Sequence, residues 1–271
     1  MFRKIAPLAF AFVAAFGLQA CGSGSAPTAT QAALGRIPSP GPLPPGAQGS
    51  LISYGRDIVH ATPRFAGKFI KASMSCEACH LGAGTQTHGG SFRGIYANFP
   101  QYNKRAGHFI TLQDRLAECF LYSMNGTPPA FSSREMIALT AYIAYLSNGA
   151  PVGSGFAGQG LVNFKPDRTP NISAGRTVYE QRCSACHGAG GQGNATYPPL
   201  WGPKSFNGGA GMHRLTTMSA FVRYNMPFGS PPNTLSKQQA YDVSAFVLSH
   251  PRPKFDKKRT IVFPPQEADT F

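Results

Sequence analysis

The pattern C-x-x-C-H occurs twice in this chain and constrains its fold more than any other feature. It stands at Cys76–His80 and again at Cys183–His187, 107 residues later. The pattern is typical of haem c attachment, in which two thiols add to the haem vinyl groups and the adjacent histidine ligates the iron. A thioredoxin-like redox pair or half of a zinc site could explain one C-x-x-C, but the recurrence of the full pattern argues against both. We predict two covalently bound haem c groups, held by Cys76, Cys79 and His80 and by Cys183, Cys186 and His187.

The two halves of the chain look like repeats of one unit, with an opening helix, the haem motif, a long loop and a closing helix. The length of 271 residues suits two small domains, and 31 Gly with 24 Pro indicate many loops. A small haem domain tolerates this because the haem supplies much of its apolar core. We therefore predict a mainly α, loop-rich fold of two tandem cytochrome c-like domains, each wrapping one haem. The predicted boundaries are 51–148 and 171–250 for the domains, 149–170 for the linker and 251–271 for a C-terminal tail.

Helical periodicity and capping residues place the main helices. In residues 133–146, apolar residues recur at helical spacing behind a serine cap. Pro251 and Pro253 follow the last helix and end it. The predicted helices are Leu51–His60, Leu112–Ser123, Ser133–Leu146, Ala174–Gln181 and Ser236–Leu248.

Residues 1–20 have the features of a secretory signal, with Arg3 and Lys4 ahead of a short apolar run. The sequence Leu18–Cys21 is similar to a bacterial lipobox, which would make Cys21 the lipidated first residue of the mature protein. Ordinary cleavage nearby, leaving Cys21 free or removing it, is the alternative. Residues 21–50 are rich in Gly, Ser, Ala and Pro and predict a tether. We expect a periplasmic lipoprotein that meets the membrane only through its anchor at Cys21.

The formal net charge of +14 favours anionic partners. The positive residues are scattered, and no Lys/Arg cluster or nucleic-acid motif is present. The charge pattern therefore argues against nucleic acid and fits small anionic ligands or an acidic redox partner.

A c-type haem iron usually takes a second axial ligand opposite its histidine, often a methionine. In the second half, Met226 lies 39 residues after His187 and directly precedes Pro227. Met212 and Met218 are nearer in sequence and fit core or loop roles. We predict Met226 as the distal ligand of the second haem.

For the first haem, two residues compete. Cys119 lies 39 residues after His80, which is the spacing seen in the second half, whereas Met124 lies 44 residues on and matches Met226 in a Tyr-x-Met echo. The positions of Arg115, Cys119 and Ser123 share one helix face. An arginine beside a thiol favours its thiolate. A buried inert cysteine and a surface pair of Arg115 with Asp114 or Glu118 are the alternatives, so the residues alone leave the distal ligand open.

The stretch Glu118–Gly126 resembles the signature of the diheme thiosulfate dehydrogenases, in which Cys-Phe precedes Ser-Met-Asn-Gly after an Asp-Arg pair, here Asp114-Arg115. The resemblance extends from about residue 51 to residue 256. It includes three stretches of the second half: Pro198–Gly202, Ser205–Asn207 and His250–Pro253.

The resemblance implies that Cys119 is the distal ligand of the first haem and that two thiosulfates are oxidised reversibly to tetrathionate there. Electrons would pass to the second haem and then to an external acceptor such as a cytochrome c. Some family members carry a lysine beside the second-haem methionine, and the two residues exchange as haem ligand on reduction. In this chain Asn225 stands at the position of that lysine. The alternatives are tetrathionate reduction in the cell and a non-enzymatic diheme electron carrier.

The chemistry itself indicates further site residues. Two thiosulfates are dianions that repel each other, so cationic groups must offset the repulsion. Arg115 and Arg134 are the best placed in sequence for this, and Ser123 can donate a hydrogen bond to a sulfonate oxygen. The predicted catalytic residues are Cys119, Arg115, Ser123 and Arg134.

The lipobox predicts the effect of one substitution. Replacing Cys21 by Ser, or treating cells with globomycin, should release the protein from the membrane fraction, because two or more acyl chains are needed for stable anchoring. Immunoblots of membrane and periplasmic fractions measure this. A wild-type protein already found in the periplasmic extract would contradict the lipoprotein prediction.

Overall fold

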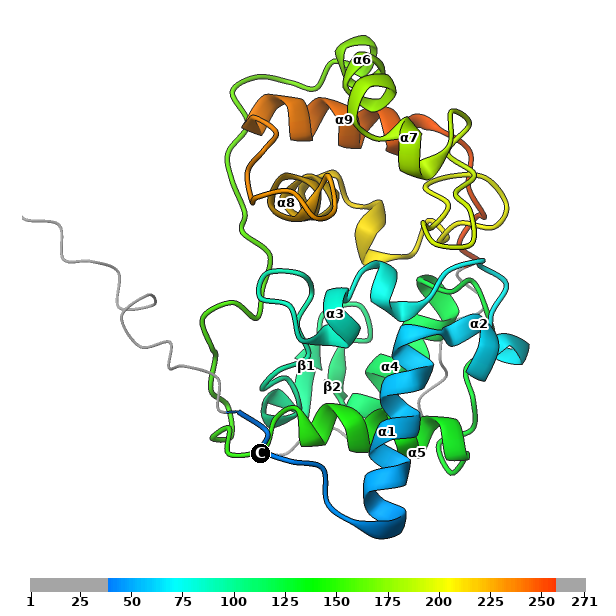
Figure 1. Ribbon diagram of the computed structural model, residues 1–271, viewed down its shortest axis with the longest axis vertical. Coiled ribbons are helices and arrows are strands. Elements are labelled where there is room, and N and C mark those ends of the chain that lie inside the picture. The colour runs from blue at the N-terminus through cyan, green and yellow to red at the C-terminus, as the bar shows by residue number, and fades with distance from the viewer. Residues whose placement is uncertain (1–38, 257–271) are drawn as a thin grey trace, which may run out of the picture. The chain divides into compact units, whose positions relative to one another are not determined.

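A computed structural model of the chain describes residues 39–256, which all belong to one compact unit. The predicted signal segment, Cys21, most of the tether and residues 257–271 lie outside the described residues. Helices and loops make up nearly all of the described chain, with one small hairpin (Figure 1).

The helices and strands follow the repeat expected from the sequence. In the first half, the longer helices are α1, α4 and α5; in the second, α6, α8 and α9 (Figure 1). The first half contains α1 Gly46–His60, α2 Thr62–Phe65, α3 Leu81–Gly84, β1 Gln101–Asn103, β2 His108–Ile110, α4 Leu112–Tyr122 and α5 Arg134–Tyr145, with short 3-10 turns at Gly67–Phe69, Cys76–Ala78 and Tyr96–Asn98. The second half contains α6 Ile172–Arg182, α7 Ser184–His187, a 3-10 turn at Gly211–His213, α8 Leu215–Asn225 and α9 Lys237–Ser249.

Side-chain caps set the starts of four of the five helices that were predicted. Thr111 and Asp114 form a reciprocal capping box at α4, and Ser236 with Gln239 forms another at α9. Ser133 caps α5 and Asn171 caps α6 through their side-chain oxygens. These polar residues satisfy backbone N–H groups that have no partner inside the helix.

Each half is built around one close pair of helices. Helix α1 packs against α5, and α6 packs against α9. A glycine lies at each contact: a Cβ on Gly55 would come within 2.1 Å of the Ala138 carbonyl oxygen, and one on Gly175 within 2.1 Å of the Asp242 carbonyl oxygen. Because neither glycine has a side chain, the backbone of α1 can approach that of α5, and the backbone of α6 can approach that of α9. Both halves therefore use a glycine at the helix contact.

Two buried apolar clusters follow the two halves, but the division is not complete. The first cluster includes Ile58, Met136 and Leu139, all from the first half. The second cluster includes Tyr179 and Val243, and it also takes in three residues of the first half, Ala72, Met74 and Met124. The two halves therefore pack together through apolar side chains.

The structure differs from the sequence prediction at several boundaries. Helix α1 begins at Gly46 rather than Leu51, so the last residues assigned to the tether are helical. Helix α8 and the β1–β2 hairpin were not predicted. The predicted linker and tail are held by hydrogen bonds, from the Gly153 N–H to the Ala97 carbonyl and from the Gly202 N–H to the Pro251 carbonyl. Within residues 39–256, no helix has the length and apolar character needed to cross a membrane.

The contact of α1 with α5 predicts that Gly55→Ala destabilises the protein. The added methyl would meet backbone, which cannot swing away, so overpacking should lower the free energy of unfolding by about 1–3 kcal/mol despite the better helix propensity of alanine. Chemical denaturation measures this. Gly67→Ala is the matched control, because a Cβ there has no neighbour within 4 Å. Equal stability of the two variants would contradict the packing argument.

Candidate functional site

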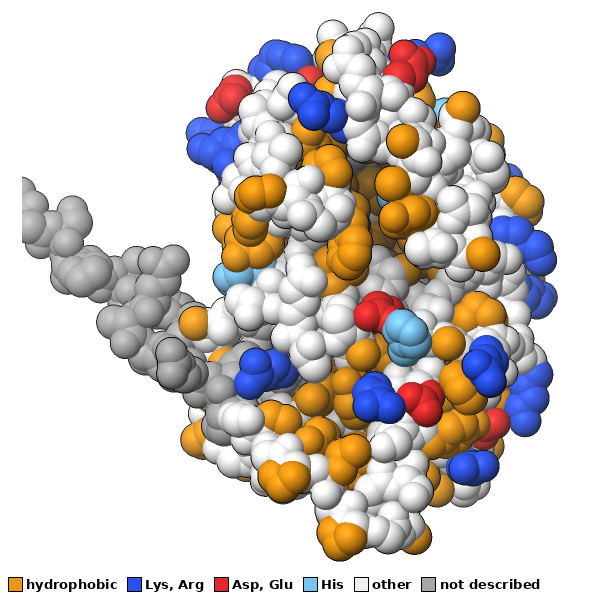
Figure 2. Space-filling model, viewed as in Figure 1, with side chains coloured by type: hydrophobic (Ala, Val, Ile, Leu, Met, Phe, Trp, Pro, Cys, Tyr) orange, Lys and Arg blue, Asp and Glu red, His pale blue; other side chains and the backbone are white. Residues whose placement is uncertain are grey.

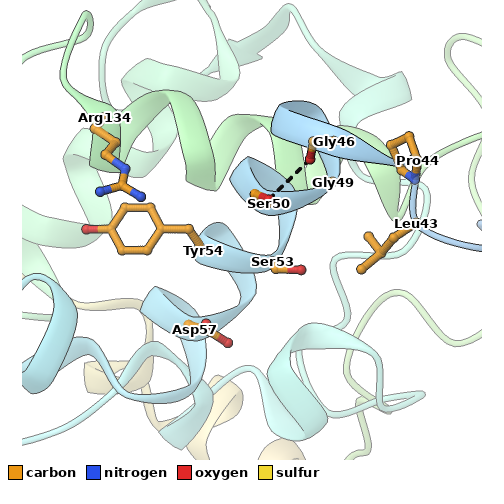
Figure 3. A pocket seen from close by; sticks show the side chains of 9 residues that line it. All are labelled: Leu43, Pro44, Gly46, Gly49, Ser50, Ser53, Tyr54, Asp57 and Arg134. Atoms are coloured by element: carbon orange, nitrogen blue, oxygen red, sulfur yellow. Dashed lines mark hydrogen bonds between the residues drawn. The ribbon is translucent and has the colours of Figure 1, made fainter.

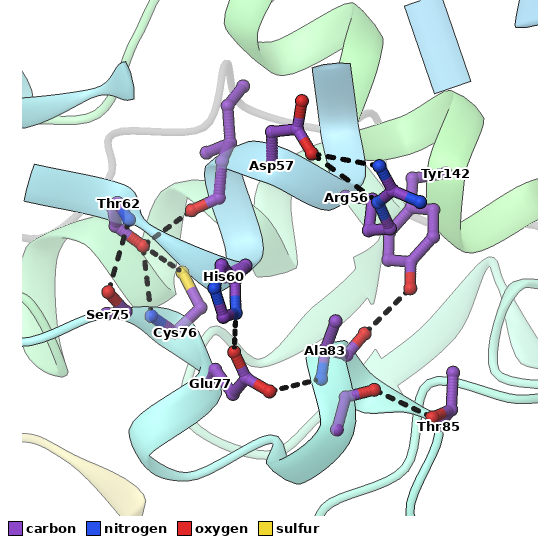
Figure 4. Close-up of polar contacts among 12 residues, drawn as sticks. Arg56, Asp57, His60, Thr62, Ser75, Cys76, Glu77, Ala83, Thr85 and Tyr142 are labelled. Carbon is purple, nitrogen blue, oxygen red and sulfur yellow. Dashed lines mark hydrogen bonds and ion pairs between the residues drawn. The ribbon is translucent and has the colours of Figure 1, made fainter. Parts of the chain in front are cut away.

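The first C-x-x-C-H motif begins in a 3-10 turn that is tied to the end of α1 (Figure 4). The Cys76 N–H donates to the Thr62 hydroxyl oxygen over 3.0 Å, and that hydroxyl donates to the Ile58 carbonyl over 2.7 Å. On the next residue, the Glu77 carboxylate accepts from the Ala83 N–H and contacts the His60 ring. The motif is therefore fixed by side chains on both sides of Cys76.

The orientation of His80 is set by one backbone carbonyl. Its Nδ1 lies 2.6 Å from the Gly90 carbonyl oxygen, so Nδ1 carries the proton and Nε2 keeps a free lone pair. Phe92 covers the ring at 4.3 Å between centroids. Gly90 has a positive φ, and a Cβ there would come within 2.4 Å of the Cys79 carbonyl oxygen, so this close loop requires glycine. Burial lowers the pKa of His80, which favours the neutral, metal-binding form.

The second motif repeats this design on a different loop. His187 lies at the end of α7, and its Nδ1 is 2.9 Å from the Pro198 carbonyl oxygen. The Tyr179 hydroxyl donates to the Gly188 carbonyl over 2.6 Å. Burial lowers the pKa of His187 as well. Both histidines thus offer Nε2 to a metal, with the other nitrogen held by a carbonyl, as is usual for metal-bound histidine.

Cys119 of α4 lies close enough to the first motif for its charge to act on both motif thiols. Burial raises the pKa of Cys76 to about 11 and that of Cys79 to about 12. The charges of the neighbouring thiols add a smaller rise to each. Burial also raises the pKa of Cys119, and the Arg115 charge opposes this rise without outweighing it. The protein alone therefore favours the thiol at Cys119, whereas metal coordination would deprotonate it.

Arg115 is half-exposed beside Cys119 and is held by a buried carboxylate. Its Nη1 donates to Glu118 Oε2 over 2.8 Å, and the Glu118 side chain is only 3% exposed. Asn103 of β1 donates to the same oxygen over 3.0 Å. The predicted alternative of an Arg115–Glu118 pair is thus present, and it leaves other guanidinium N–H groups of Arg115 open to an anion.

The other two predicted catalytic residues lie in different surroundings. Ser123 follows α4 directly, and its backbone N–H donates to the Cys119 carbonyl. Its hydroxyl has no hydrogen-bond partner among residues 39–256. Arg134 begins α5, and its guanidinium lies 4.3 Å from the centre of the Tyr54 ring, at an open pocket that Asp57 also lines (Figure 3). The charge of Arg115 acts on the Cys119 thiol, whereas Arg134, at the start of α5, stacks on the Tyr54 ring.

The methionines divide between core and loop positions. Met218 and Met124 are buried in the second apolar cluster, and Met212 packs against it. Met226 lies at the end of α8, where its N–H donates to the Val222 carbonyl. The residue before it, Asn225, is buried and bonded to the loop that follows His80: it accepts from Gln86 and donates to the His88 carbonyl.

The basic residues are spread over the surface. In Figure 2, Lys and Arg side chains are scattered over the face in view and alternate with polar and apolar side chains. This arrangement agrees with the scattered charge of the sequence.

Comparisons with known proteins match each half to a family. Residues 61–152 match the family described as SoxA/TsdA, cytochrome c domain, and residues 172–251 match the cytochrome c family. The chain is 40% identical over 231 residues to the thiosulfate dehydrogenase of Allochromatium vinosum, covering 82% of this chain and 85% of that protein. It is 39% identical over 218 residues to that of Stutzerimonas stutzeri, covering 78% and 71%. The chain belongs to the thiosulfate dehydrogenase family.

A solved structure agrees with this assignment. The structure of the thiosulfate dehydrogenase TsdBA from Marichromatium purpuratum superposes with a TM-score of 0.76 at 30% identity, covering 85% of this chain and 54% of that one. The chain thus spans about half the length of that protein. The predicted family, the fold of two cytochrome c domains and the enzyme class are confirmed.

As a thiosulfate dehydrogenase with two cytochrome c domains, the protein binds one haem c per domain. The residues fit this group, since each motif offers a thiol pair and a neutral imidazole.

Arg252 is a second feature that fits a bound haem, because it has no carboxylate partner among the described residues. Its Nη atoms donate to the Leu200 and Val247 carbonyls, whereas its buried Nε has no acceptor, and burial lowers its pKa to about 10. A partly buried cation without a carboxylate partner is suited to an anionic group, and the propionates of a haem are such groups.

Several of these features carry no sequence signal. The Gly90 and Pro198 carbonyls are backbone atoms, so no residue type indicates them. Glu118 stands within the recognised signature, but its burial and its bond to Asn103 depend on the hairpin that was not predicted. Arg252 belongs to the His-Pro-Arg-Pro stretch noted in the sequence, but its bonds to the Leu200 and Val247 carbonyls carry no sequence signal.

Proposed function

We propose that this protein joins two thiosulfates into tetrathionate at its first haem centre, with Cys119 as both the distal haem ligand and the reacting sulfur. The observation that carries the proposal is the thiol of Cys119, which lies near enough to the motif thiols Cys76 and Cys79 for its charge to act on both, and on which the charge of Arg115 acts in turn. Relatives named thiosulfate dehydrogenase over most of the chain support the substrate.

The two motifs hold the haems covalently in this proposal. Cys76 and Cys79 attach the first haem with His80 as its proximal ligand, and Cys183, Cys186 and His187 do the same for the second. Met226, at the end of α8, is the distal ligand of the second haem. The burial of Met218 and Met124 in an apolar cluster supports this choice, because both already have packing roles.

Arg115 and Ser123 bind the sulfonate end of thiosulfate. The Arg115 side chain is half-exposed, and its guanidinium donates to sulfonate oxygens through N–H groups other than the one that Glu118 accepts. The Ser123 hydroxyl, which is free of protein partners within residues 39–256, donates to the same group. Because Arg134 lies over Tyr54, we assign the anion contact to Arg115 rather than to both arginines.

The bond-making steps occur on the Cys119 sulfur. The Cys119 thiolate joins the outer sulfur of one thiosulfate to give a cysteinyl thiosulfonate, and two electrons leave. A second thiosulfate then attacks that outer sulfur, forms the central S–S bond of tetrathionate and releases the Cys119 thiolate. No proton is consumed or released in either step, and the reverse sequence reduces tetrathionate.

When bound, the haems would supply two one-electron acceptors: the first, held by Cys76, Cys79 and His80, would pass the electrons to the second, held by Cys183, Cys186 and His187, and an external acceptor such as a cytochrome c would take them up. The reaction is reversible in this proposal. We place the protein in the periplasm, as is typical for cytochrome c domains of this kind, with a lipid anchor at Cys21.

Met226 predicts a spectroscopic property of the second haem. A methionine ligand should give a weak absorbance band near ~695 nm in the oxidised protein, because the axial ligand sets the electronic structure of the haem. Met226→Gly should abolish this band and slow electron exit while substrate affinity stays nearly unchanged. A band that persists in this variant would point to Met124, Met212 or Met218.

Cys119→Met tests the proposed function most directly among single substitutions. Methionine has similar bulk and can ligate iron, so the protein should fold with two haems. The potential of the first haem should rise, because a neutral thioether replaces an electron-donating thiolate. Thiosulfate oxidation should nearly vanish, because a thioether cannot form the thiosulfonate.

Met124→Leu is the matched control, since it should leave the first haem's spectrum and the activity intact. Unchanged spectra and turnover in Cys119→Met, with a changed haem spectrum in Met124→Leu, would support the electron-carrier alternative instead.

Arg115→Ala should separate binding from ligation. The haem spectra should survive, whereas affinity for thiosulfate should fall roughly ten- to a hundred-fold, the effect of losing a charge-assisted contact of about 1.5–3 kcal/mol. Steady-state kinetics measure this as a rise in KM. Arg134→Ala removes the same charge away from the thiol and should change KM little. A larger rise in KM for Arg134→Ala than for Arg115→Ala would indicate that Arg134 makes the contact with the anion.

A further inference from the structure

The end of helix α4, which carries Cys119, uses hydrogen bonds from both halves of the protein. The last carbonyls of a helix have no partners inside it. In α4, the Cys119 carbonyl accepts from Ser123 and Met124, and the Phe120 carbonyl accepts from Gly126. All of these bonds come from the same segment. The next two carbonyls, of Leu121 and Tyr122, accept hydrogen bonds from the second half of the chain.

Asn207 supplies both of the missing donors. Its side-chain Nδ2 donates to the Leu121 carbonyl over 2.9 Å, and its backbone N–H donates to the Tyr122 carbonyl over 3.3 Å. The same Nδ2 also lies 3.3 Å from the side-chain oxygen of Asn125, a residue with positive φ just beyond the helix. Asn207 belongs to the stretch that matches the cytochrome c family, whereas α4 belongs to the SoxA/TsdA match.

Asn207 is itself held rigidly. It is 2% exposed, and its side-chain oxygen accepts from the Gly209 N–H over 2.8 Å. The flanking backbone is tied to the first half on both sides: the Lys204 carbonyl accepts from the Ser73 N–H, and the Gly209 carbonyl accepts from Arg105. A donor fixed this firmly can define where the helix end lies.

Buried hydrogen-bonding groups that lose their partner are costly, so the loss of Asn207 would loosen the last turn of α4. Cys119 and Ser123 both lie on that turn or directly after it. The consequence would be felt at the first haem centre, although Asn207 belongs to the second domain.

We propose that Asn207 is a positioning residue for the first haem centre, because it caps from the other domain the helix that carries Cys119. This inference rests on the proposed role of Cys119 as the distal ligand. Asn207 lies in the Ser-Phe-Asn stretch of the second half, which otherwise has no part in the mechanism.

Two residues of the second domain provide matched controls. Ser205 is fully buried two residues away, and its hydroxyl donates within its own domain, to the Pro199 carbonyl over 3.1 Å. Asn225 also bonds across the two halves, through Gln86 and the His88 carbonyl, but it precedes Met226. Ser205→Ala removes a buried hydrogen bond without touching α4, and Asn225→Ala removes hydrogen bonds between the two halves that do not involve the end of α4.

The experiment compares purified diheme protein carrying Asn207→Ala, Asn207→Asp, Ser205→Ala or Asn225→Ala with the wild type. The aspartate variant keeps the acceptor for Gly209 but has no donor for the Leu121 carbonyl. The readouts are the low-spin thiolate signal of the first haem by electron paramagnetic resonance, the potential of each haem, and kcat and KM for thiosulfate.

We expect both Asn207 variants to lose part of the thiolate signal, to raise the first haem's potential and to lower kcat roughly two- to tenfold, the effect of one net hydrogen bond. Ser205→Ala should leave the first haem unchanged, and Asn225→Ala, which leaves the Asn207 bonds to α4 in place, should keep the thiolate signal of the first haem. An unchanged first haem in the Asn207 variants, or a shift matched by Ser205→Ala, would overturn the inference. So would failure of both Asn207 variants to yield diheme protein, because Asn207 would then determine folding. Absence of the thiolate signal in the wild type would instead refute the proposed role of Cys119.

Discussion

The bond from each motif histidine to a backbone carbonyl is the constraint on which both halves of this protein depend. His80 is held by Gly90 and His187 by Pro198, and each acceptor lies in the loop that follows its motif. The loop must therefore return to its own histidine, which requires tight turns such as the one at Gly90. With Nδ1 held by the carbonyl, Nε2 is the nitrogen left for iron.

The two centres share this arrangement of the motif histidine but differ in the residue proposed as the second ligand. In our proposal this difference gives the two haems separate tasks. The first centre has a thiol, Cys119, with a guanidinium whose other side is held by a buried glutamate. The second has the thioether of Met226 at a helix end. A thiol can form and release a sulfur–sulfur bond whereas a thioether cannot, so the chemistry belongs to the first centre and electron exit to the second.

Local patterns in the sequence predicted the two haem sites, the helix that carries Arg115 and Cys119, and the other capped helices. Helix α8 was missed because Arg214 at its start makes no side-chain cap and no sequence signal marks the beginning. The bonds from Asn207 to α4 join residues more than 80 positions apart and depend on how the two halves pack. Such contacts follow from the tertiary structure, and single-residue patterns do not encode them.

Interconversion of thiosulfate and tetrathionate is the activity that we propose for this protein. The most direct test is a pair of assays on the purified diheme protein: reduction of ferricyanide dependent on thiosulfate, and oxidation of a reduced viologen dependent on tetrathionate. Our account predicts turnover in both assays, with tetrathionate formed in the first at one molecule per two electrons transferred. Reduction of the haems by a general reductant, with no turnover of thiosulfate or tetrathionate in either assay, would contradict it and leave a diheme electron carrier.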